Sequence, residues 1–558
     1  MRVIRRIPSL LVSLLCGVGL SSCQSVDQAQ VVERLRQTAY QLGEDHPDYI
    51  STWQRILQLD PRNLEAHVML GWKLLTSSSA DWQSLGISLL ENAFDPKVVT
   101  PTIDFKFPQT MAIAATIGRY RSQQKEYTKG KFFTELALEL SKLHTPYKEG
   151  EPCLQMQLAT MFDYFPVSTE EADMALQALE YWGKNLLARD NWVIQENEIS
   201  QNMPGAEADP FVHCMLSLFT LSFYYRADVA ATAARFYEMA RRGWPTLGNY
   251  QAPHVIRYAQ QVSRETKNRD QTCEDRRIQL GVIAGVLSDG HSVTEDFGGV
   301  LERLDRNLFH VTYIYLFESG SPVMANFTTT HPDDKRFVWQ KQPSDQGTGA
   351  WLLRWGQQVA SMELDMILYL DLTMSTFARR MGMMRLAPVQ MNTHGHPVTS
   401  GHDPAVMNYF VSWAEAELPM EQAQTHYTEK LVMIRHGKLH QYYQRRILPG
   451  DRSRMDGAYF GNLTRADFGL PTTASLYLCM QKPFKLHPEF DPLVCGILQK
   501  DAQGHAVLHR EEVPGNHQVF LQRLERAGCD MNRVHFVPAQ PHHRLLALYR
   551  LSTLVLDS

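Results

Sequence analysis

The hydrophobic pattern of the chain changes its period near residue 278, and this change constrains the fold more than any other feature. Residues 278–287 read IQLGVIAGVL, a nearly continuous apolar run. A helical pattern at 293–304 and a second apolar run at 310–316 follow it. Strand, helix and strand in this order indicate a right-handed βαβ unit, because parallel neighbours need a crossover connection. We therefore predict a Rossmann-like domain with a parallel sheet at 278–450.

The same alternation returns near the C-terminal end. We predict strands at 476–480, 506–508, 534–537 and 553–557, and helices at 489–499, 519–528 and 542–551. Region 455–558 is therefore predicted to be a second, partial Rossmann-like domain.

The pattern from residue 28 to 265 is helical throughout. The phrase LDPRN at 59–63 returns in weaker form as FDPK at 94–97, thirty-five positions later (59 to 94). This distance is close to the roughly 34-residue period of tetratricopeptide helix pairs, and Leu70-Gly71 fits the same pattern. We predict an α-helical, tetratricopeptide-like domain at 28–265, followed by a charged linker at 263–277.

The first 23 residues have the layout of a signal peptide. Three arginines precede the apolar stretch 7–20, and the segment ends LSSC at Cys23, as in a lipobox. The apolar run is short for a spanning helix. An over-long start or a buried amphipathic helix is the alternative.

Charge and cysteine content exclude some classes of function. The 55 Lys and Arg against 60 Asp and Glu give a net charge of −5, which argues against nucleic-acid binding. The 8 cysteines show neither a C-x-x-C motif nor zinc-type spacing. We predict reduced core thiols, with no disulfide and no metal site.

Residues 386–410, LAPVQMNTHGHPVTSGHDPAVMNYF, mix kinking residues with histidine, threonine and serine. We predict an irregular segment, too broken for helix or sheet, that lines a site for a polar ligand. Asp371 closes the apolar strand 366–371 before it, and is predicted either to order this loop or to cap a helix.

Four phrases carry a family resemblance: RLAPVQ, GHPVTSG, NYFVS and HYTEKLV. They resemble the catalytic region of the O-GlcNAc transferase-like protein glycosyltransferases (glycosyltransferase family 41), and are closest to the bacterial branch that includes the adhesin N-glucosyltransferases. The resemblance implies a GT-B type pair of Rossmann-like domains behind a helical domain. It also implies transfer of GlcNAc or Glc from a UDP-sugar to Ser/Thr or Asn side chains of acceptor proteins, without a metal cofactor.

On the acceptor side, the resemblance implies roles for two histidines. His291, in DGHSV, corresponds to a proposed base or acceptor contact, with helix capping as the alternative. His396 corresponds to a histidine of the sugar-facing loop. Thr399 and Ser400 are expected to donate to the sugar or phosphate, and Gly395 and Gly401 to support this loop.

On the donor side, Lys485 in CMQKPFKLHP matches a lysine near the nucleotide phosphates. Ala539 and Gln540 lie where relatives hold uracil by backbone groups. His394 replaces an aromatic residue and Asn408 replaces an aspartate of the relatives, so the sugar is left open.

The family's second domain continues beyond Asp557 with a glycine- and threonine-rich turn, so we predict a C-terminally truncated chain. A catalytically silent homologue that acts as a helical protein-binding module is the alternative function, and a nucleotide-sugar epimerase is a third. Because UDP-sugars are cytoplasmic, we predict a cytoplasmic location. Export or membrane anchoring through residues 1–23 is the alternative.

Overall fold

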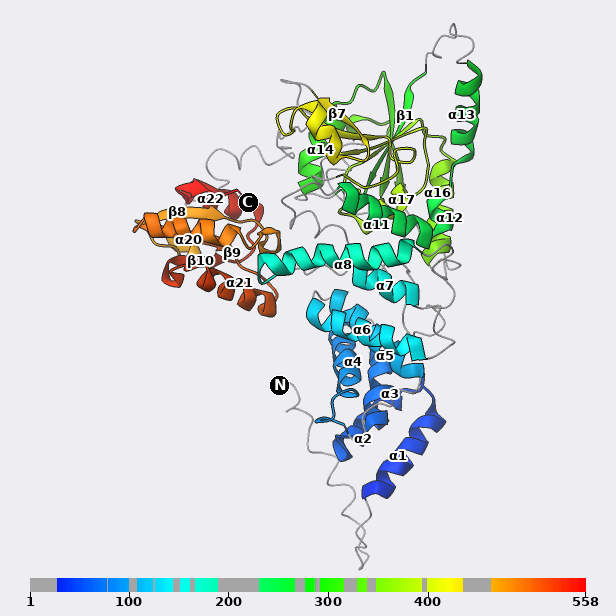
Figure 1. Cartoon of the computed structure of the whole chain (residues 1–558), viewed down its shortest axis with the longest axis vertical. Coiled ribbons are helices and arrows are strands. Elements are labelled where there is room, and N and C mark those ends of the chain that lie inside the picture. Colours follow the sequence, from blue (N-terminus) through cyan, green and yellow to red (C-terminus); the bar gives the residue numbers. More distant parts are fainter. Residues whose placement is uncertain are drawn as a thin grey trace, which may run out of the picture. The chain divides into compact units, whose positions relative to one another are not determined.

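The computed structural model describes residues 28–77, 79–99, 108–123, 126–143, 151–160, 166–188, 230–265, 276–285, 287, 292–315, 329–338, 348–393, 399–434 and 463–557. The predicted signal segment at 1–23 and most of the predicted linker lie outside these ranges. The chain divides into two compact units, Met1–Asp104 and Phe105–Ser558 (Figure 1).

The first unit contains four helices, α1 Gln28–Leu42, α2 Tyr49–Leu59, α3 Leu64–Leu75 and α4 Ala80–Asn92. Asp60 and Pro61 end α2, and the Asn63 side chain accepts the Ala66 backbone N–H at 3.0 Å as the N-cap of α3. The apolar faces of the helices enclose a core around Trp53, which is fully buried.

Helices α3 and α4 pack closely because small residues face each other. A Cβ on Gly71 would lie 2.9 Å from the Leu90 side chain, and one on Gly86 would lie 2.7 Å from the Gly71 carbonyl oxygen. The two related phrases also meet, since the Arg62 guanidinium donates to the Pro96 carbonyl oxygen at 3.1 Å. Assignment of these helices to the tetratricopeptide class stays a prediction.

The second unit begins with helices α5 Pro108–Gln123, α6 Tyr127–Leu143, α7 Glu151–Thr160, α8 Thr169–Leu187, α11 Ala230–Gly243, α12 Pro245–Gly248 and α13 Pro253–Glu265. Met156, Leu186 and Phe236 from these helices share one hydrophobic core with Ile283 of the sheet. The structure therefore divides the chain at Asp104 and not at the charged stretch after residue 265. The core that α7, α8 and α11 share with the sheet is the physical reason.

The first sheet has seven parallel strands in the order β3-β2-β1-β4-β5-β6-β7. The strands are β1 Ile278–Ala284, β2 Phe309–Tyr315, β3 Lys335–Val338, β4 Met366–Tyr369, β5 Val389–Thr393, β6 Tyr409–Trp413 and β7 Lys430–Ile434. Helices α14 Ser292–Arg303, α16 Thr348–Ala360, α17 Thr376–Gly382 and α18 Met420–Ala423 connect them. The Rossmann-like fold predicted for this region is confirmed.

Apolar cores cover both faces of this sheet. Ile283 and Ile367 face the core formed with α11, α16 and α17, whereas Val282 and Val311 face the core formed with α14. Burial on both sides explains why β1 reads as a continuous apolar run and not as an alternating one.

One expectation for this region is wrong. Residues 386–410 were expected to be too irregular for a strand, yet Val389–Thr393 forms β5 and pairs in parallel with β4 and β6. Polar residues Gln390 and Asn392 are buried in this strand, at 0% and 1% exposure. Hydrogen bonds of these side chains make their burial possible, as when the Gln390 amide donates to the Val406 carbonyl oxygen. The strand therefore lacks the apolar pattern by which a central strand is normally recognised.

The second sheet has four parallel strands in the order β10-β9-β8-β11: β8 Ser475–Cys479, β9 Gly504–His509, β10 Val534–Val537 and β11 Leu554–Val555. Helices α20 Phe490–Lys500 and α21 Pro514–Arg526 cover one face, and α22 His542–Leu551 packs against the other. The predicted strand and helix order is confirmed here. Strand β11 is an exposed edge, with Leu554 53% and Val555 48% exposed.

The expectation that the cysteines form no disulfide is wrong for one pair. Cys495 in α20 and Cys529 after α21 are joined by a disulfide, with their Cα atoms 4.5 Å apart. The two helices pack side by side on one face of the second sheet, which brings together residues that are 34 positions apart. Cys479 is a free, buried thiol, and burial raises its pKa.

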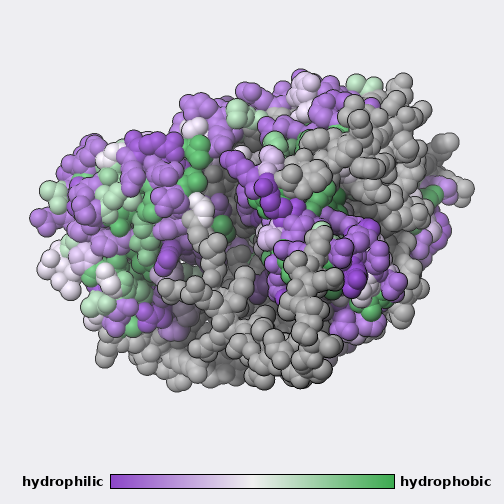
Figure 2. All heavy atoms as spheres, turned by 90° about the horizontal axis from the view of Figure 1, so that it is seen from below, coloured by the Kyte–Doolittle hydropathy of each residue, from purple (hydrophilic) through white to green (hydrophobic). Residues whose placement is uncertain are grey.

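Figure 2 shows one face of the molecule, on which hydrophilic residues are interspersed with small hydrophobic patches. In the part of the chain that the structure describes, no helix combines the length and the hydrophobicity that a membrane span requires.

Candidate functional site

The first candidate site lies at the switch point of the seven-stranded sheet. From β1 the chain proceeds outward through β2 and β3, then returns to place β4 on the other side of β1. Ligands of open parallel sheets bind at the carboxyl ends of strands at such a point. Asp371 lies here after β4, and its two carboxylate oxygens accept the Gly285 backbone N–H at 3.1 and 2.9 Å. Asp371 therefore links the carboxyl ends of the neighbouring strands β1 and β4.

Residues 399–402, which come after β5, lie at the opposite, amino edge of this sheet, because they bind Glu429, which directly precedes the parallel strand β7. Thr399 and Ser400 are each 1% exposed, and both hydroxyls donate to the carboxylate of Glu429. The Thr399 bond measures 2.6 Å, and the Ser400 backbone N–H donates to the same carboxylate at 2.9 Å. The structure thus places these two predicted donor-site residues inside the loop, with their hydroxyls turned to a protein carboxylate.

Gly401 fixes this loop against helix α11. Its φ of +74° lies in the left-handed region, and a Cβ there would lie 2.2 Å from the backbone carbonyl of Ala233. Only glycine satisfies both conditions without displacement. His402 follows, is buried, and packs its ring 4.3 Å from that of Tyr237 in α11. Burial lowers the pKa of His402 to about 3, so its imidazole is neutral.

The second candidate site lies at the switch point of the four-stranded sheet, between β8 and β11. The loop after β8 contains a short 3-10 turn, Pro483–Lys485, which begins beside the carboxyl end of that strand. Lys485 is half-buried, and this burial lowers the pKa of its ammonium group. A partly desolvated cation at such an edge interacts more strongly with an anion than a fully hydrated one does.

A buried ion pair holds the far side of this loop. The Arg523 guanidinium binds the Asp491 carboxylate through two bonds of 2.8 and 3.0 Å, and also donates to the Leu486 carbonyl oxygen at 3.0 Å. Arg523 and Asp491 are each 3% exposed. The residue after Lys485 is therefore tied to helices α20 and α21 through one guanidinium group.

Other residues gather at the same edge. Ala539 and Gln540 follow β10 and are accessible, and the Gln540 side chain donates to the Pro538 carbonyl oxygen at 3.0 Å. They lie two strands away from the loop of Lys485, because β9 intervenes. His509 ends β9, and burial together with the charge of Lys482 lowers its pKa.

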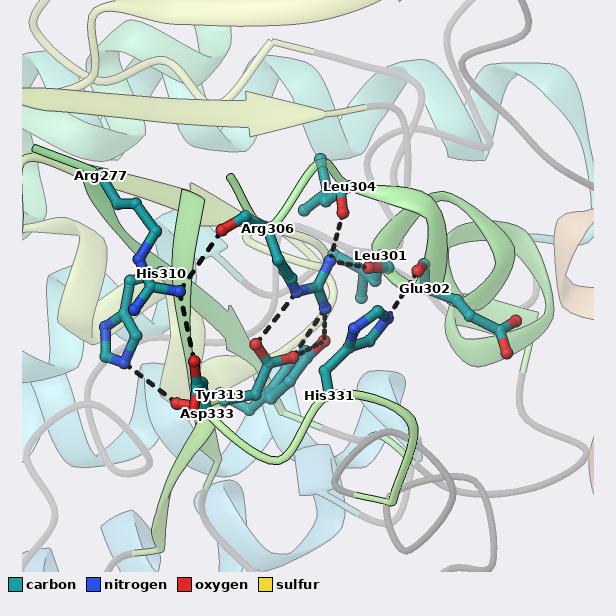
Figure 3. Close-up of polar contacts among 10 residues, drawn as sticks. Arg277, Leu301, Glu302, Leu304, Arg306, His310, Tyr313, His331 and Asp333 are labelled. Atoms are coloured by element: carbon teal, nitrogen blue, oxygen red, sulfur yellow. Dashed lines mark hydrogen bonds and ion pairs between the residues drawn. The ribbon is translucent and has the colours of Figure 1, made fainter. Parts of the chain in front are cut away.

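The opposite, amino edge of the first sheet carries a polar network of structural character (Figure 3). The Arg306 guanidinium pairs with Asp334 at 2.6 Å, and donates to the carbonyl oxygens of Leu301 and Leu304, both at 2.9 Å. These carbonyls end helix α14, so Arg306 acts as its C-terminal cap. The segment LERLDR at 301–306 therefore serves the fold, at an edge remote from the strand carboxyl ends.

Of the predicted site residues, Asp371, Lys485, Ala539 and Gln540 lie at strand carboxyl edges. Thr399, Ser400 and Gly401 lie at the amino edge of the first sheet, beside the start of β7. His291, Gly395 and His396 lie outside the described residues. Sequence reasoning missed Glu429, which is part of the quoted phrase HYTEKLV, and it missed the pair of Asp491 and Arg523. Among the residues that the structure describes, no cluster of three or more His, Cys, Asp or Glu side chains could hold a metal ion.

Solved structures of several proteins resemble this chain, among them the following three. A Thermobaculum terrenum O-GlcNAc transferase mutant shares 15% identity over 96% of this chain and 79% of its own, with a TM-score of 0.47. Anabaena HepE, in complex with UDP and glucose, shares 14% identity over 50% of this chain and 73% of its own, with a TM-score of 0.30. A Listeria monocytogenes putative UDP-N-acetylglucosamine 2-epimerase shares 13% identity over 50% and 74%, with a TM-score of 0.28.

No family model and no curated protein matches the chain. The fold class predicted from the sequence, a helical N-terminal region followed by a GT-B type pair of Rossmann-like domains, is confirmed.

Proposed function

We propose that the chain is a glycosyltransferase that moves GlcNAc or Glc from a UDP-sugar to Ser/Thr or Asn side chains of proteins. Two parallel sheets, each with a loop-bearing switch point, support this proposal because nucleotide and sugar ligands bind at such edges.

The observation that carries the proposal is the position of Lys485. It lies in the turn after the central strand β8 and is half-buried, and the Arg523 bond to Leu486 fixes the backbone beside it. In the transfer step, the acceptor oxygen or nitrogen attacks the anomeric carbon while the bond from that carbon to the UDP oxygen breaks. Negative charge builds on the departing diphosphate, and a fixed ammonium group stabilises it there. The acceptor proton passes to a base, for which His291 is the candidate from the sequence.

The first sheet would hold the acceptor side of the reaction. Asp371 fixes the switch point by accepting the Gly285 N–H, so the loop after β1 starts from a defined position. Reacting groups that are held in place before reaction lower the entropic part of the barrier.

The test is sugar transfer by the full chain. UDP-GlcNAc and UDP-Glc are each supplied with a peptide that contains Ser, Thr and Asn, and the intact mass of the peptide is measured. We expect a mass increase of one hexose or one N-acetylhexosamine. Absence of both transfer and UDP binding in the unchanged chain would overturn the proposal.

Two lysine variants test the role of Lys485. We expect Lys485→Ala to weaken UDP binding about tenfold to a hundredfold, since a charged hydrogen bond contributes about 1.5–3 kcal/mol. Lys482→Ala is the matched control, because Lys482 is 46% exposed and pairs with Glu512 at 3.3 Å. An equal, small effect of both variants in a calorimetric titration would remove Lys485 from the phosphate site.

A further inference from the structure

The imidazole of His509 has one nitrogen that the fold uses and one that it leaves open. His509 is the last residue of β9, and its Nδ1 atom lies 2.7 Å from the Arg510 carbonyl oxygen. Because a carbonyl oxygen can only accept, Nδ1 carries the proton, and the neutral ring has its lone pair at Nε2. In the part of the chain that the structure describes, Nε2 forms no hydrogen bond. It is also not enclosed, as the two unpartnered ring nitrogens of His402 are.

The backbone around His509 is fixed on both sides. Its Cα partner in β10 is Val537, and the Arg510 N–H donates to the Val537 carbonyl oxygen at 2.8 Å. Two residues after His509, the Glu511 carboxylate accepts the Val513 N–H at 3.1 Å, immediately before α21. The side chain of His509 is only 5% exposed, so the ring itself is held by its neighbours. The imidazole is therefore presented from a rigid strand end.

The charge state of the ring decides which ligand group it can bind. Burial and the positive charge of Lys482 hold the pKa of His509 below the ordinary value of about 6.5, so the ring is neutral at pH 7. Lys482 lies in the loop after β8, which places the ring at the carboxyl edge of the second sheet. A neutral nitrogen with a lone pair accepts a hydrogen bond from a hydroxyl group, whereas the oxygens of an ionised phosphate have no proton to donate.

The place of His509 in the sheet matches the middle of a UDP molecule. Strand β9 lies between β8 and β10. Lys485, the proposed phosphate ligand, follows β8, whereas Ala539 and Gln540, the proposed uracil contacts, follow β10. The three strands are parallel, so their loops leave the same edge, and neighbouring strands are about 4.8 Å apart. Because the ribose joins the uracil to the diphosphate, it crosses the end of β9, where His509 lies.

We propose that His509 is a specificity-determining residue of the donor site, whose Nε2 atom accepts a hydrogen bond from a hydroxyl group of the ribose. This inference rests on the proposed function and names a further contact of the same site. A site built to bind a hydroxyl group discriminates against an analogue that lacks it, because the protein atom is then left without a partner. His509 would therefore favour a ribonucleotide over a deoxyribonucleotide.

The first test uses the unchanged chain and three nucleotides. UDP, 2′-deoxy-UDP and 3′-deoxy-UDP are compared by calorimetric titration. One of the two deoxynucleotides should bind about threefold to tenfold more weakly than UDP, which corresponds to the net contribution of one neutral hydrogen bond. Equal affinity for all three nucleotides would overturn the inference. No binding of UDP at all would overturn the proposed function, and this contact with it.

The second test assigns the difference to His509. His509→Phe keeps a flat ring and removes the lone pair, so UDP affinity should fall about threefold to tenfold, while the Kd for the discriminated deoxynucleotide stays within about twofold. His509→Gln retains an acceptor and should recover part of the loss. His535→Phe is the matched control, because His535 lies near the start of β10, away from the carboxyl edge, and pairs with His505 at 2.8 Å.

The pattern across the nucleotides separates a ligand contact from a structural role. A purely structural effect of His509→Phe would weaken UDP and both deoxynucleotides by the same factor, and this outcome would refute the contact. If His509→Phe does not fold, the nucleotide comparison in His509→Gln and in the unchanged chain still decides. UDP affinity that is lowered equally in His535→Phe would also refute it, since that variant leaves the carboxyl edge intact.

Discussion

Replacement of Arg523 by methionine gives the sharpest test of how the Lys485 loop is held. The variant keeps an unbranched, flexible apolar stem and removes the guanidinium group. Asp491 then remains 3% exposed without its bidentate partner, and the Leu486 carbonyl oxygen loses its donor. Breaking a buried pair from one side costs about 3–5 kcal/mol, because the remaining charge is left unpaired. At about 1.36 kcal/mol per factor of ten, the population of opened molecules rises roughly 150-fold to 5,000-fold.

Native-state hydrogen exchange measures this loss locally, in peptides that cover α20, α21 and β8. Arg526→Met is the control on the same helix, because Arg526 is exposed and donates to the Gln522 carbonyl oxygen. We expect the control to change stability by less than about 0.5 kcal/mol. The double variant Asp491→Leu with Arg523→Met should regain most of the loss, since apolar replacement of a whole buried pair is often neutral.

The pH dependence gives an independent check. Burial raises the pKa of Asp491, although Arg523 acts in the opposite direction. An acid with a raised native pKa favours the neutral form in the fold, so its ionisation costs stability as pH rises through that pKa. The loss caused by Arg523→Met should therefore be large at pH 7 and shrink below about pH 4, where Asp491 is neutral. A loss no larger than that of the Arg526 control, at any pH, would refute the reasoning.

Three further results are expected. Gly401→Ala should lower the free energy of unfolding in urea by about 3 kcal/mol, because the residue has a positive φ and a Cβ there would clash with α11. Gly469→Ala is the control: Gly469 has a φ of +68° but open space around it, so the loss should be only about 1 kcal/mol. Burial lowers the pKa of His402 to about 3. The neutral imidazole therefore makes its full contribution to the free energy of unfolding above about pH 6.5, and this contribution falls by about 1.4 kcal/mol for each pH unit below that value. In His402→Phe the free energy of unfolding should depend less on pH in this range. Reduction of the Cys495–Cys529 disulfide should lower the free energy of unfolding by about 4 kcal/mol, because the two cysteines are 34 positions apart. Amide hydrogen exchange of the second sheet, measured with and without reductant, tests this. Equal exchange rates under the two conditions would count against the disulfide.

Much of the fold was predictable because its strands are buried on both faces. Strands β1 and β2 are continuous apolar runs, and β10 was predicted with its observed bounds, Val534–Val537. Strand β5 was missed because the polar residues Gln390 and Asn392 are buried in its interior, where each side-chain oxygen accepts a backbone N–H. The disulfide was not predicted because Cys495 and Cys529 are 34 positions apart and are brought together only by the packing of α20 and α21.

Some of the polar residues beside the sheets could likewise be predicted from the sequence, and others could not. Lys485 and Asp371 follow strands directly, so their place at a carboxyl edge could be read from the order of elements. Glu429 could not, because its partners Thr399 and Ser400 are about thirty positions away and meet it only after β5, β6 and β7 have paired. Sequence patterns identify the loops at a site, whereas the charges that hold those loops depend on the completed sheet.

One loop beside each sheet is held by a buried charge in the same way. In the second sheet, a buried arginine from α21 binds the backbone beside Lys485; in the first, a buried glutamate before β7 binds the loop at Thr399. In both cases the charge sits on an element other than the one that carries the loop, and is largely removed from water. Such a bond orders a loop without occupying its outer surface, so that surface stays available for a ligand. If the chain transfers sugar, loss of the Arg523 bond should therefore weaken UDP binding, whereas loss of the Glu429 bonds, at the amino edge of the first sheet, should lower stability and leave UDP binding unchanged.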